Sequence, residues 1–159
     1  MEGAKLMCKI GVISDTHGLI RPEALQALQG VGHIIHAGDI GSAAVIGELE
    51  KLAPVTAVRG NVDGGSWALE FSHTAVVEIG GAVLYVIHDL HQLDLDPRAA
   101  GFSAVISGHS HFPAQEVRDG VFYFNPGSAG RRRFHLPVTV GYLTISDKQV
   151  YGEIITLQL

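Results

Sequence analysis

The sequence has little cysteine and few charged side chains. Its 159 residues contain one cysteine, Cys8, and only 17% are charged, whereas 47% are hydrophobic. A single cysteine excludes an intrachain disulfide and also the sets of several thiolates that hold structural zinc. A low charge content with many apolar residues is typical of a folded globular chain and unlike a disordered one.

Positive charge is scarcer than negative charge. Eleven Lys and Arg stand against sixteen Asp and Glu, which gives a formal net charge of −5. This balance offers no broad attraction for nucleic-acid backbones or anionic membranes. We therefore expect no general nucleic-acid binding and no membrane partner, and any recognition of phosphate should be local and assisted by a metal.

Long apolar runs are also missing. No stretch approaches the roughly 20 residues of a membrane helix, and the first residues lack the features of a secretory signal. We find no linker, repeat or low-complexity segment either. The sequence thus predicts one cytoplasmic domain over residues 1–159, a length at which folding buries about 70% of the unfolded chain's surface.

The first 60 residues alternate between apolar strands and short helices. We predict strands over 7–14, 33–37 and 55–58, because these are nearly continuous apolar runs. Helices are predicted from Pro22 to Gln29 and from Ser42 to Leu52, with Ser42 as N-cap. Strands of this kind, alternating with helices, are typical of a parallel sheet covered on both faces.

The remainder of the chain favours hairpins. Two-residue turns at Gly80-Gly81, Asp119-Gly120 and Asp147-Lys148 each separate two apolar segments. A further buried strand is predicted over 104–107. Parallel strands followed by hairpins predict an α/β fold, a four-layer α-β-β-α sandwich of two mixed sheets flanked by helices.

Polar residues that suit metal ions follow five of the predicted strands. Because the carboxyl ends of strands in open α/β sheets border the ligand crevice, these loops should meet there. The candidate ligands are Asp15, His17, Asp39, Asn61, His88, His109 and His111, and the glycines beside them are Gly18, Gly38, Gly60 and Gly108.

The spacing and the types of these residues carry chemical information. Asp15-x-His17 and His109-x-His111 would each put two ligands on one side of an extended segment, so each pair could grip one cation. Carboxylate, imidazole and amide oxygen without thiolate suit Mn²⁺ first, with Fe²⁺, Zn²⁺ or Ni²⁺ as alternatives. The set favours a catalytic metal site over a structural one.

The order of the motifs resembles the calcineurin-like metallophosphoesterase superfamily. The series runs Asp15-x-His17, Gly38-Asp39, Gly60-Asn61, His88 and Gly108-His109-x-His111, and spans nearly the whole chain. The segment 125–128, Asn-Pro-Gly-Ser, makes it similar to the small bacterial and archaeal phosphodiesterase branch.

The resemblance implies a dinuclear phosphodiesterase that acts on a small, possibly nucleotide-like phosphate ester. It places one metal on Asp15, His17 and His111 and the other on Asn61, His88 and His109, with Asp39 bridging both. Asp39, Asn61 and His88 are the catalytic candidates among these ligands. A hydroxide between the two cations would then attack phosphorus.

One position departs from the wider superfamily. Many members have Gly-Asn-His-Glu, whose histidine sits over the leaving group, whereas this chain has Gly60-Asn61-Val62-Asp63. Val62 cannot transfer a proton, which supports the small phosphodiesterase branch and argues against broad phosphomonoesterase activity. Asp63 is available, but it matches the glutamate.

Several alternatives stay open. His36 could orient the site or be a satisfied histidine at the sheet edge, and the basic run 131–133 could face phosphate, solvent or another subunit. The same resemblance includes the retromer scaffold subunit, so a protein-interaction scaffold is an alternative, as is a module that binds nucleotide or metal without hydrolysis. A homo-oligomer is also open.

Overall fold

The computed structural model describes residues 7–159, so residues 1–6 of the predicted domain lie outside the described part. The first of its two sheets has five strands in the order β10-β9-β1-β2-β3. Their bounds are β1 Met7–Ile13, β2 His33–His36, β3 Val55–Ala57, β9 Thr139–Ser146 and β10 Gln149–Thr156. β1, β2 and β3 are parallel, while β9 and β10 are antiparallel to their neighbours. The sheet is therefore mixed, as predicted.

The second sheet is also mixed, with the order β4-β5-β6-β8-β7. Its strands are β4 Thr74–Ile79, β5 Ala82–Ile87, β6 Ala104–Ile106, β7 Pro113–Arg118 and β8 Val121–Pro126. β5, β6 and β8 run parallel, whereas β4 and β7 are antiparallel edge strands. Each sheet thus has three neighbouring parallel strands whose carboxyl ends can carry ligands.

Three hairpins have the turn residues that the sequence predicts. Both central residues have positive φ at Gly80-Gly81, at Asp119-Gly120 and at Asp147-Lys148. Turns with two positive φ angles match the right-handed twist of the flanking strands and favour Gly, Asn and Asp. These turns set the register of β4 with β5, β7 with β8, and β9 with β10.

The inner faces of the two sheets pack against each other. Fully buried side chains from both sheets, including Ile10, Ile35, Leu84, Phe124 and Ile145, form one cluster. A second cluster lies between the first sheet and the helices α1 Pro22–Ala27 and α2 Ala43–Glu50. Ser42 occupies the N-cap position of α2 as predicted, but its side chain makes no capping hydrogen bond. The 3-10 helix η1, Ser66–Glu70, adds Trp67 to the same cluster.

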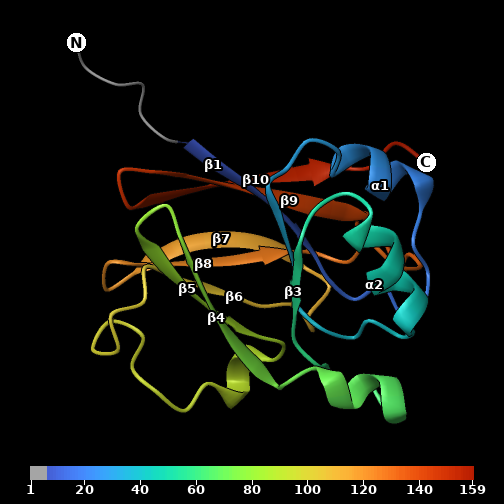
Figure 1. Cartoon of the computed structure of the whole chain (residues 1–159), viewed down its shortest axis with the longest axis horizontal. Helices are drawn as coiled ribbons and strands as arrows, with labels where there is room; N and C mark the ends of the chain where they lie inside the picture. The colour runs from blue at the N-terminus through green and yellow to red at the C-terminus, as the bar shows by residue number, and fades with distance from the viewer. Residues whose placement is uncertain (1–6) are drawn as a thin grey trace.

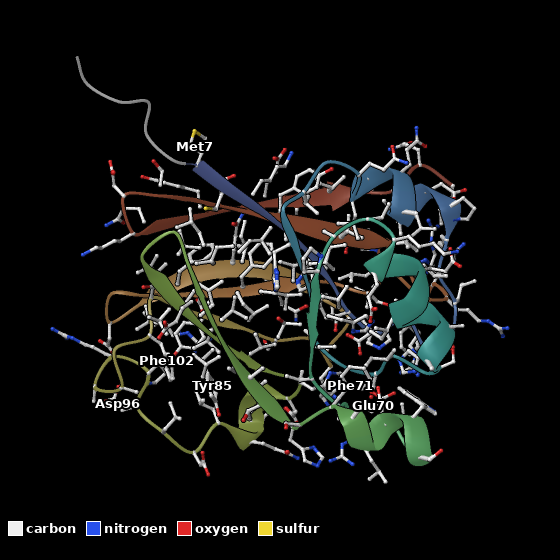
Figure 2. All side chains as sticks on the ribbon, in the orientation of Figure 1. Met7, Glu70, Phe71, Tyr85, Asp96 and Phe102 are labelled. Atoms are coloured by element: carbon white, nitrogen blue, oxygen red, sulfur yellow. The ribbon has the colours of Figure 1, made fainter. Side chains whose placement is uncertain are left out.

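The two-sheet sandwich is confirmed, and its outermost layers differ from each other. α1 and α2 lie together at one side of the molecule, whereas the yellow segment after β5 lies at the other (Figure 1). This segment contains only the short 3-10 helix η2, Leu90–Gln92, yet it covers the outer face of the second sheet. Phe102 stacks on Tyr85 of β5 with ring centroids 4.9 Å apart (Figure 2). A loop with aromatic and leucine side chains therefore takes the place of a helix in this layer.

The helices are short. None among residues 7–159 is long and apolar enough to cross a membrane. The carboxyl ends of β1, β2, β3, β5 and β6 lead into the loops that hold all seven candidate ligands.

Candidate metal centre

Six of the seven predicted ligands form two compact groups. In each group the potential ligand atoms all lie within 4.8 Å of one another. One group consists of Asp15, His17 and His111, and the other of Asp39, His88 and His109. Each combines two buried residues with one exposed histidine, so the site opens to solvent beside His17 and His109.

One of the two predicted ligand pairs is divided between the groups, although an extended segment would place both of its residues on the same cation. Asp15 and His17 share a group, but His109 and His111 belong to different ones. The backbone is not extended in either pair, because all four residues have positive φ, between 47° and 70°. His109 and His111 therefore fall into separate groups. These groups separate the histidines as the family resemblance implies, while Asn61 lies outside both of them.

Left-handed backbone is concentrated at the candidate ligands. Asp39, with φ of 55°, joins the four residues above. Such conformations cost non-glycine residues about 1 kcal/mol or more each, and they persist where the surrounding structure enforces them. Backbone hydrogen bonds from Asp15 N to Gly38 O, His17 N to Asp39 O and Gly18 N to Ile40 O tie the loops after β1 and β2 together.

Each of the two buried aspartates has one oxygen held and one oxygen directed into the site. Asp15 Oδ2 accepts hydrogen bonds from Ser14 Oγ at 2.8 Å and from His109 N at 3.1 Å. Asp39 Oδ1 accepts from Val62 N at 3.1 Å. The other oxygens, Asp15 Oδ1 and Asp39 Oδ2, face imidazoles.

Both inward oxygens lie near imidazoles of both groups. Asp39 Oδ2 is 3.2 Å from His88 Nε2 and 3.8 Å from His17 Nε2. Asp15 Oδ1 is 3.8 Å from His88 Nε2, 3.9 Å from His17 Nε2 and 3.4 Å from His111 Nε2. Because one carboxylate oxygen reaches both groups, the two groups form a single site.

His88 is oriented for coordination by its second ring nitrogen. Nδ1 donates to Ala37 O at 2.7 Å, which fixes the tautomer with the lone pair on Nε2, the nitrogen facing Asp39. Burial lowers the pKa of His88, but contact with Asp39 and the charge of Asp15 outweigh it and raise the pKa above the ordinary value. For Asp39, burial raises the pKa, while His88 and the Val62 N–H bring it below the ordinary value. The site thus has a negative field that favours a cation.

The residues present fit divalent cations. Among residues 7–159, Asp15 Oδ1 and His88 Nε2 are buried and make no hydrogen bond. A buried polar atom without a partner is costly, and these two point into a set of carboxylate and imidazole donors. Such donors suit Mn²⁺, Fe²⁺ or Zn²⁺.

Three glycines beside the ligands are required by close packing. A Cβ on Gly38 would lie 2.6 Å from His88 Nδ1, and one on Gly60 would lie 2.1 Å from Asp39 Oδ1. At Gly108 it would meet Ser14 Oγ at 2.0 Å. Gly18, the fourth predicted glycine, has open space around it and a φ of +86°. Close approach explains three of these glycines, and backbone conformation explains the fourth.

Asn61 follows β3 and is exposed, and it lines a cavity of about 280 Å³ together with His88 and Asp89. This places it beside the second group. Val62 is 58% exposed and contributes its backbone N–H to Asp39.

Asp63 has a role that sequence reasoning missed. Its carboxylate accepts hydrogen bonds from Ile40 N at 3.1 Å, Gly41 N at 2.9 Å and Gly60 N at 2.9 Å. Asp63 therefore clamps the loop after β2 to the loop after β3. All three hydrogen bonds use the carboxylate as acceptor, so Asp63 acts in this structure as a clamp between loops.

His36 is buried behind the site and holds its loops. Its Nδ1 accepts from Gly38 N at 3.1 Å, so Nε2 carries the hydrogen and donates to Thr16 Oγ1 at 2.9 Å. Thr16 Oγ1 in turn donates to Ile40 O at 2.8 Å. The orienting role is thus the one that this geometry supports. By contrast, His33 bonds Thr56 Oγ1 at 2.8 Å, away from the ligands.

The side chains of Arg131, Arg132 and Arg133 are exposed. The preceding residue, Gly130, accepts a hydrogen bond at its carbonyl from Arg21 at 3.2 Å.

Asp89 contacts two histidines. Its Oδ1 accepts a hydrogen bond from His91 N at 3.0 Å, and its Oδ2 lies 3.8 Å from His109 Nε2.

Comparison with known proteins decides the family. Residues 8–148 match the model of the calcineurin-like phosphoesterase superfamily domain. The chain belongs to this superfamily. A probable metallophosphoesterase of Methanothermobacter thermautotrophicus is 37% identical over 92% of this chain and 91% of the relative. A phosphodiesterase of Methanocaldococcus jannaschii is 32% identical over 92% of this chain and 98% of its own length.

Solved structures share the fold. An archaeal phosphodiesterase superposes with a TM-score of 0.79 at 29% identity, over 94% of this chain and 99% of that one. Vacuolar Protein Sorting 29 of Cryptosporidium parvum has a TM-score of 0.76 at 16% identity, over 96% and 99% of the two chains. At that identity the second likeness shows the fold alone. The candidate ligands and the phosphodiesterase relatives favour the enzyme over the scaffold.

Gly60→Ala tests the packing around Asp39. The added Cβ would collide with Asp39 Oδ1 and move the carboxylate, so we expect Mn²⁺ affinity to fall by about 10- to 100-fold. Gly64→Ala in the same loop is the control, because nothing lies within 4 Å of its added Cβ. Isothermal titration of metal-free protein measures both. Equal affinities in the two variants would contradict the close-packed arrangement.

The buried His36 predicts a pH dependence of stability. Burial lowers the pKa of His36 from 6.5 to about 4. Above pH 6.5 neither state is protonated, and between 6.5 and about 4 only the unfolded state takes up the proton. The free energy of unfolding of metal-free protein should therefore fall by about 1.4 kcal/mol per unit as the pH drops through this window.

Substitution of His36 tests whether it causes this pH dependence. His36→Gln should remove the fall in the free energy of unfolding between pH 6.5 and pH 5, whereas His135→Gln in an exposed loop should retain it. Urea unfolding between pH 7 and pH 5 supplies the free energies. The same slope in both variants would show that His36 does not carry the effect.

Proposed function

We propose that the chain is a phosphodiesterase that holds two divalent cations and hydrolyses a small phosphate ester. The observation that carries the proposal is the position of Asp39 Oδ2, which lies 3.2 Å from His88 Nε2 and 3.8 Å from His17 Nε2. One carboxylate oxygen between two ligand groups can offset the repulsion of two cations about 3.5–4 Å apart. The phosphodiesterase relatives give independent support.

Each residue has a distinct role in this proposal. One cation would be held by Asp15, His17 and His111 and the other by Asn61, His88 and His109, with Asp39 shared. Two cations bound in this way supply an acidified water as nucleophile at neutral pH and offset the charge that develops on phosphate oxygens. Mn²⁺ is the first candidate, with Fe²⁺, Zn²⁺ and Ni²⁺ as alternatives.

The chain's own groups position the reaction. The Ala37 carbonyl fixes the His88 ring, and the Val62 N–H fixes one oxygen of Asp39, so neither ligand has to reorganise when substrate binds. Asp15 and Asp39 are only 0% and 4% exposed, and this burial strengthens their interaction with bound charge. The exposed His17 and His109 lie at the entrance to the site.

Val62 favours diesters over monoesters. Its exposed apolar side chain cannot protonate a leaving group, and the carboxylate of Asp63 is occupied by three backbone N–H groups. A general acid commonly contributes about 10²–10⁴-fold. The preferred substrate should therefore be a diester whose leaving group departs without a proton.

Metal removal and Asp39→Asn test the function. Chelation should abolish hydrolysis of bis(p-nitrophenyl) phosphate, and Mn²⁺ should restore it, because the nucleophile depends on metal-acidified water. Asp39→Asn should lower kcat by at least about 100-fold even at saturating Mn²⁺, since an amide removes the negative charge from the shared position.

Asp119→Asn is the matched control, because Asp119 is exposed in the β7–β8 turn, belongs to neither ligand group and has a positive φ that asparagine also accepts. Initial rates measured by release of nitrophenolate, together with metal content, compare the variants. Full activity of metal-free protein, or Asp39→Asn kinetics equal to those of Asp119→Asn, would contradict the proposed function.

A further inference from the structure

A groove of about 220 Å³ lies directly beside the candidate metal centre. It is bounded by the β5–η2 segment, the loop after β6 and the strands β7 and β8. Its lining includes Leu90, Phe112, Ala114 and Tyr123, with Asp89 and Ser110 at the polar edge. We propose that this groove binds a nucleobase of the substrate, and thus that the substrate is a nucleoside phosphodiester. The inference rests on the proposed function.

The groove is continuous with the site through His109. This residue lines the groove and also belongs to the second ligand group. Ser110 lines it as well and stands between His109 and His111 in the chain. A phosphate held at the centre would therefore have one of its ester substituents next to the groove.

The size of the groove suits one ring system. Pockets for drug-sized ligands measure about 300–1,000 Å³, so about 220 Å³ is too little for a whole nucleotide. The sugar and phosphate would remain outside it, toward the ligands. The base can therefore lie in the groove while the phosphate lies at the metal centre.

The walls offer surfaces for stacking. Phe112 is 59% exposed and Tyr123 is half-buried. The guanidinium of Arg118 lies over the Tyr123 ring, 4.7 Å from its centroid, and Glu116 holds Arg118 in an ion pair. Aromatic rings and planar guanidinium groups both stack on nucleobases.

The polar edge matches a nucleobase better than a plain aryl ring. Ser110 Oγ accepts hydrogen bonds from Phe112 N at 3.2 Å and from Asn125 Nδ2 at 3.1 Å, which leaves its hydrogen to donate. Asp89 Oδ1 accepts from His91 N, and Oδ2 faces His109 from 3.8 Å and can accept from a ligand. A donor and an acceptor that line one groove can complement the edge of a base, which carries both.

The neighbouring cavity is less suited to a base. It has about 280 Å³, and its wall combines Tyr85 and Ile87 with the charged or polar side chains of Arg59, His73 and Asp94. A base placed there would have to displace water from these polar groups, which is costly without matching hydrogen bonds. The more apolar lining of the groove beside His109 therefore assigns the base to that groove.

Ala114→Phe tests the assignment by filling the groove. Ala114 is an exposed residue of the edge strand β7, and phenylalanine is well accepted in strands. Val117→Phe is the matched control, because Val117 is exposed on the same strand but lies outside the groove. Phe112→Ala, a truncation at an exposed position, is the second groove variant, and thermal unfolding verifies that all three fold.

The probes are adenosine 5′-monophosphate and inorganic phosphate, titrated into Mn²⁺-loaded protein by calorimetry. Stacking of one base contributes about 1–3 kcal/mol, so Ala114→Phe should raise the Kd of the nucleotide by about tenfold or more. Phe112→Ala should raise it several-fold and Val117→Phe should leave it unchanged. The Kd of phosphate reports the metal centre in each variant. A nucleotide Kd that is equal in all four proteins would overturn the assignment.

Failure of the groove and failure of the function are distinguishable. The metal-loaded protein could hydrolyse bis(p-nitrophenyl) phosphate while Ala114→Phe leaves the Kd of the nucleotide unchanged. This result would refute the groove assignment and support the proposed function. Adenosine without phosphate, added to metal-free protein, should shift the NMR signals of Phe112 and Tyr123. Such shifts without any metal-dependent hydrolysis would support the groove and refute the function.

Discussion

Two buried carboxylates without a lysine or arginine partner are the constraint on which the site depends. Asp15 and Asp39 are almost fully buried, and within residues 7–159 the ion pairs that they form are with histidines alone. Burying such charges is costly unless cations compensate them. Backbone N–H groups hold only one oxygen of each. The remaining oxygens, together with the imidazoles, form an environment that suits divalent cations.

The fold supplies this arrangement by bringing two sheets together at the carboxyl ends of their parallel strands. The loops after β1 and β2 contribute the two carboxylates and His17, and the loop after β3 contributes Asn61. The loops after β5 and β6 contribute His88, His109 and His111. Left-handed backbone at five ligands and glycines without room for a Cβ let the loops approach closely. Asp63 and His36 lock those loops from behind. Local strain at the ligands is thus balanced by hydrogen bonds and packing around them.

The sequence predicts much of this because hydrophobic patterns and turn residues act locally. The three hairpin turns and the strands that precede the ligands lie where apolar runs and Gly or Asp pairs place them. The outer layer on the second sheet could not be predicted from the strand pattern. There a loop takes the place of the expected helix and packs Phe102 on Tyr85. The separation of His109 from His111 was also beyond local rules, since it depends on positive φ at both residues. Likewise, the clamp by Asp63 joins loops 23 residues apart in the chain.

We propose that one carboxylate oxygen of Asp39 serves two cations in a single site. Electron paramagnetic resonance during titration of metal-free protein with Mn²⁺ can detect this arrangement, because close metal ions that share a ligand couple their spins. We expect two Mn²⁺ per chain and a spin-coupled signal at saturation, and Asp39→Asn should weaken or abolish that signal. A single bound ion, or two ions with uncoupled six-line spectra, would contradict it.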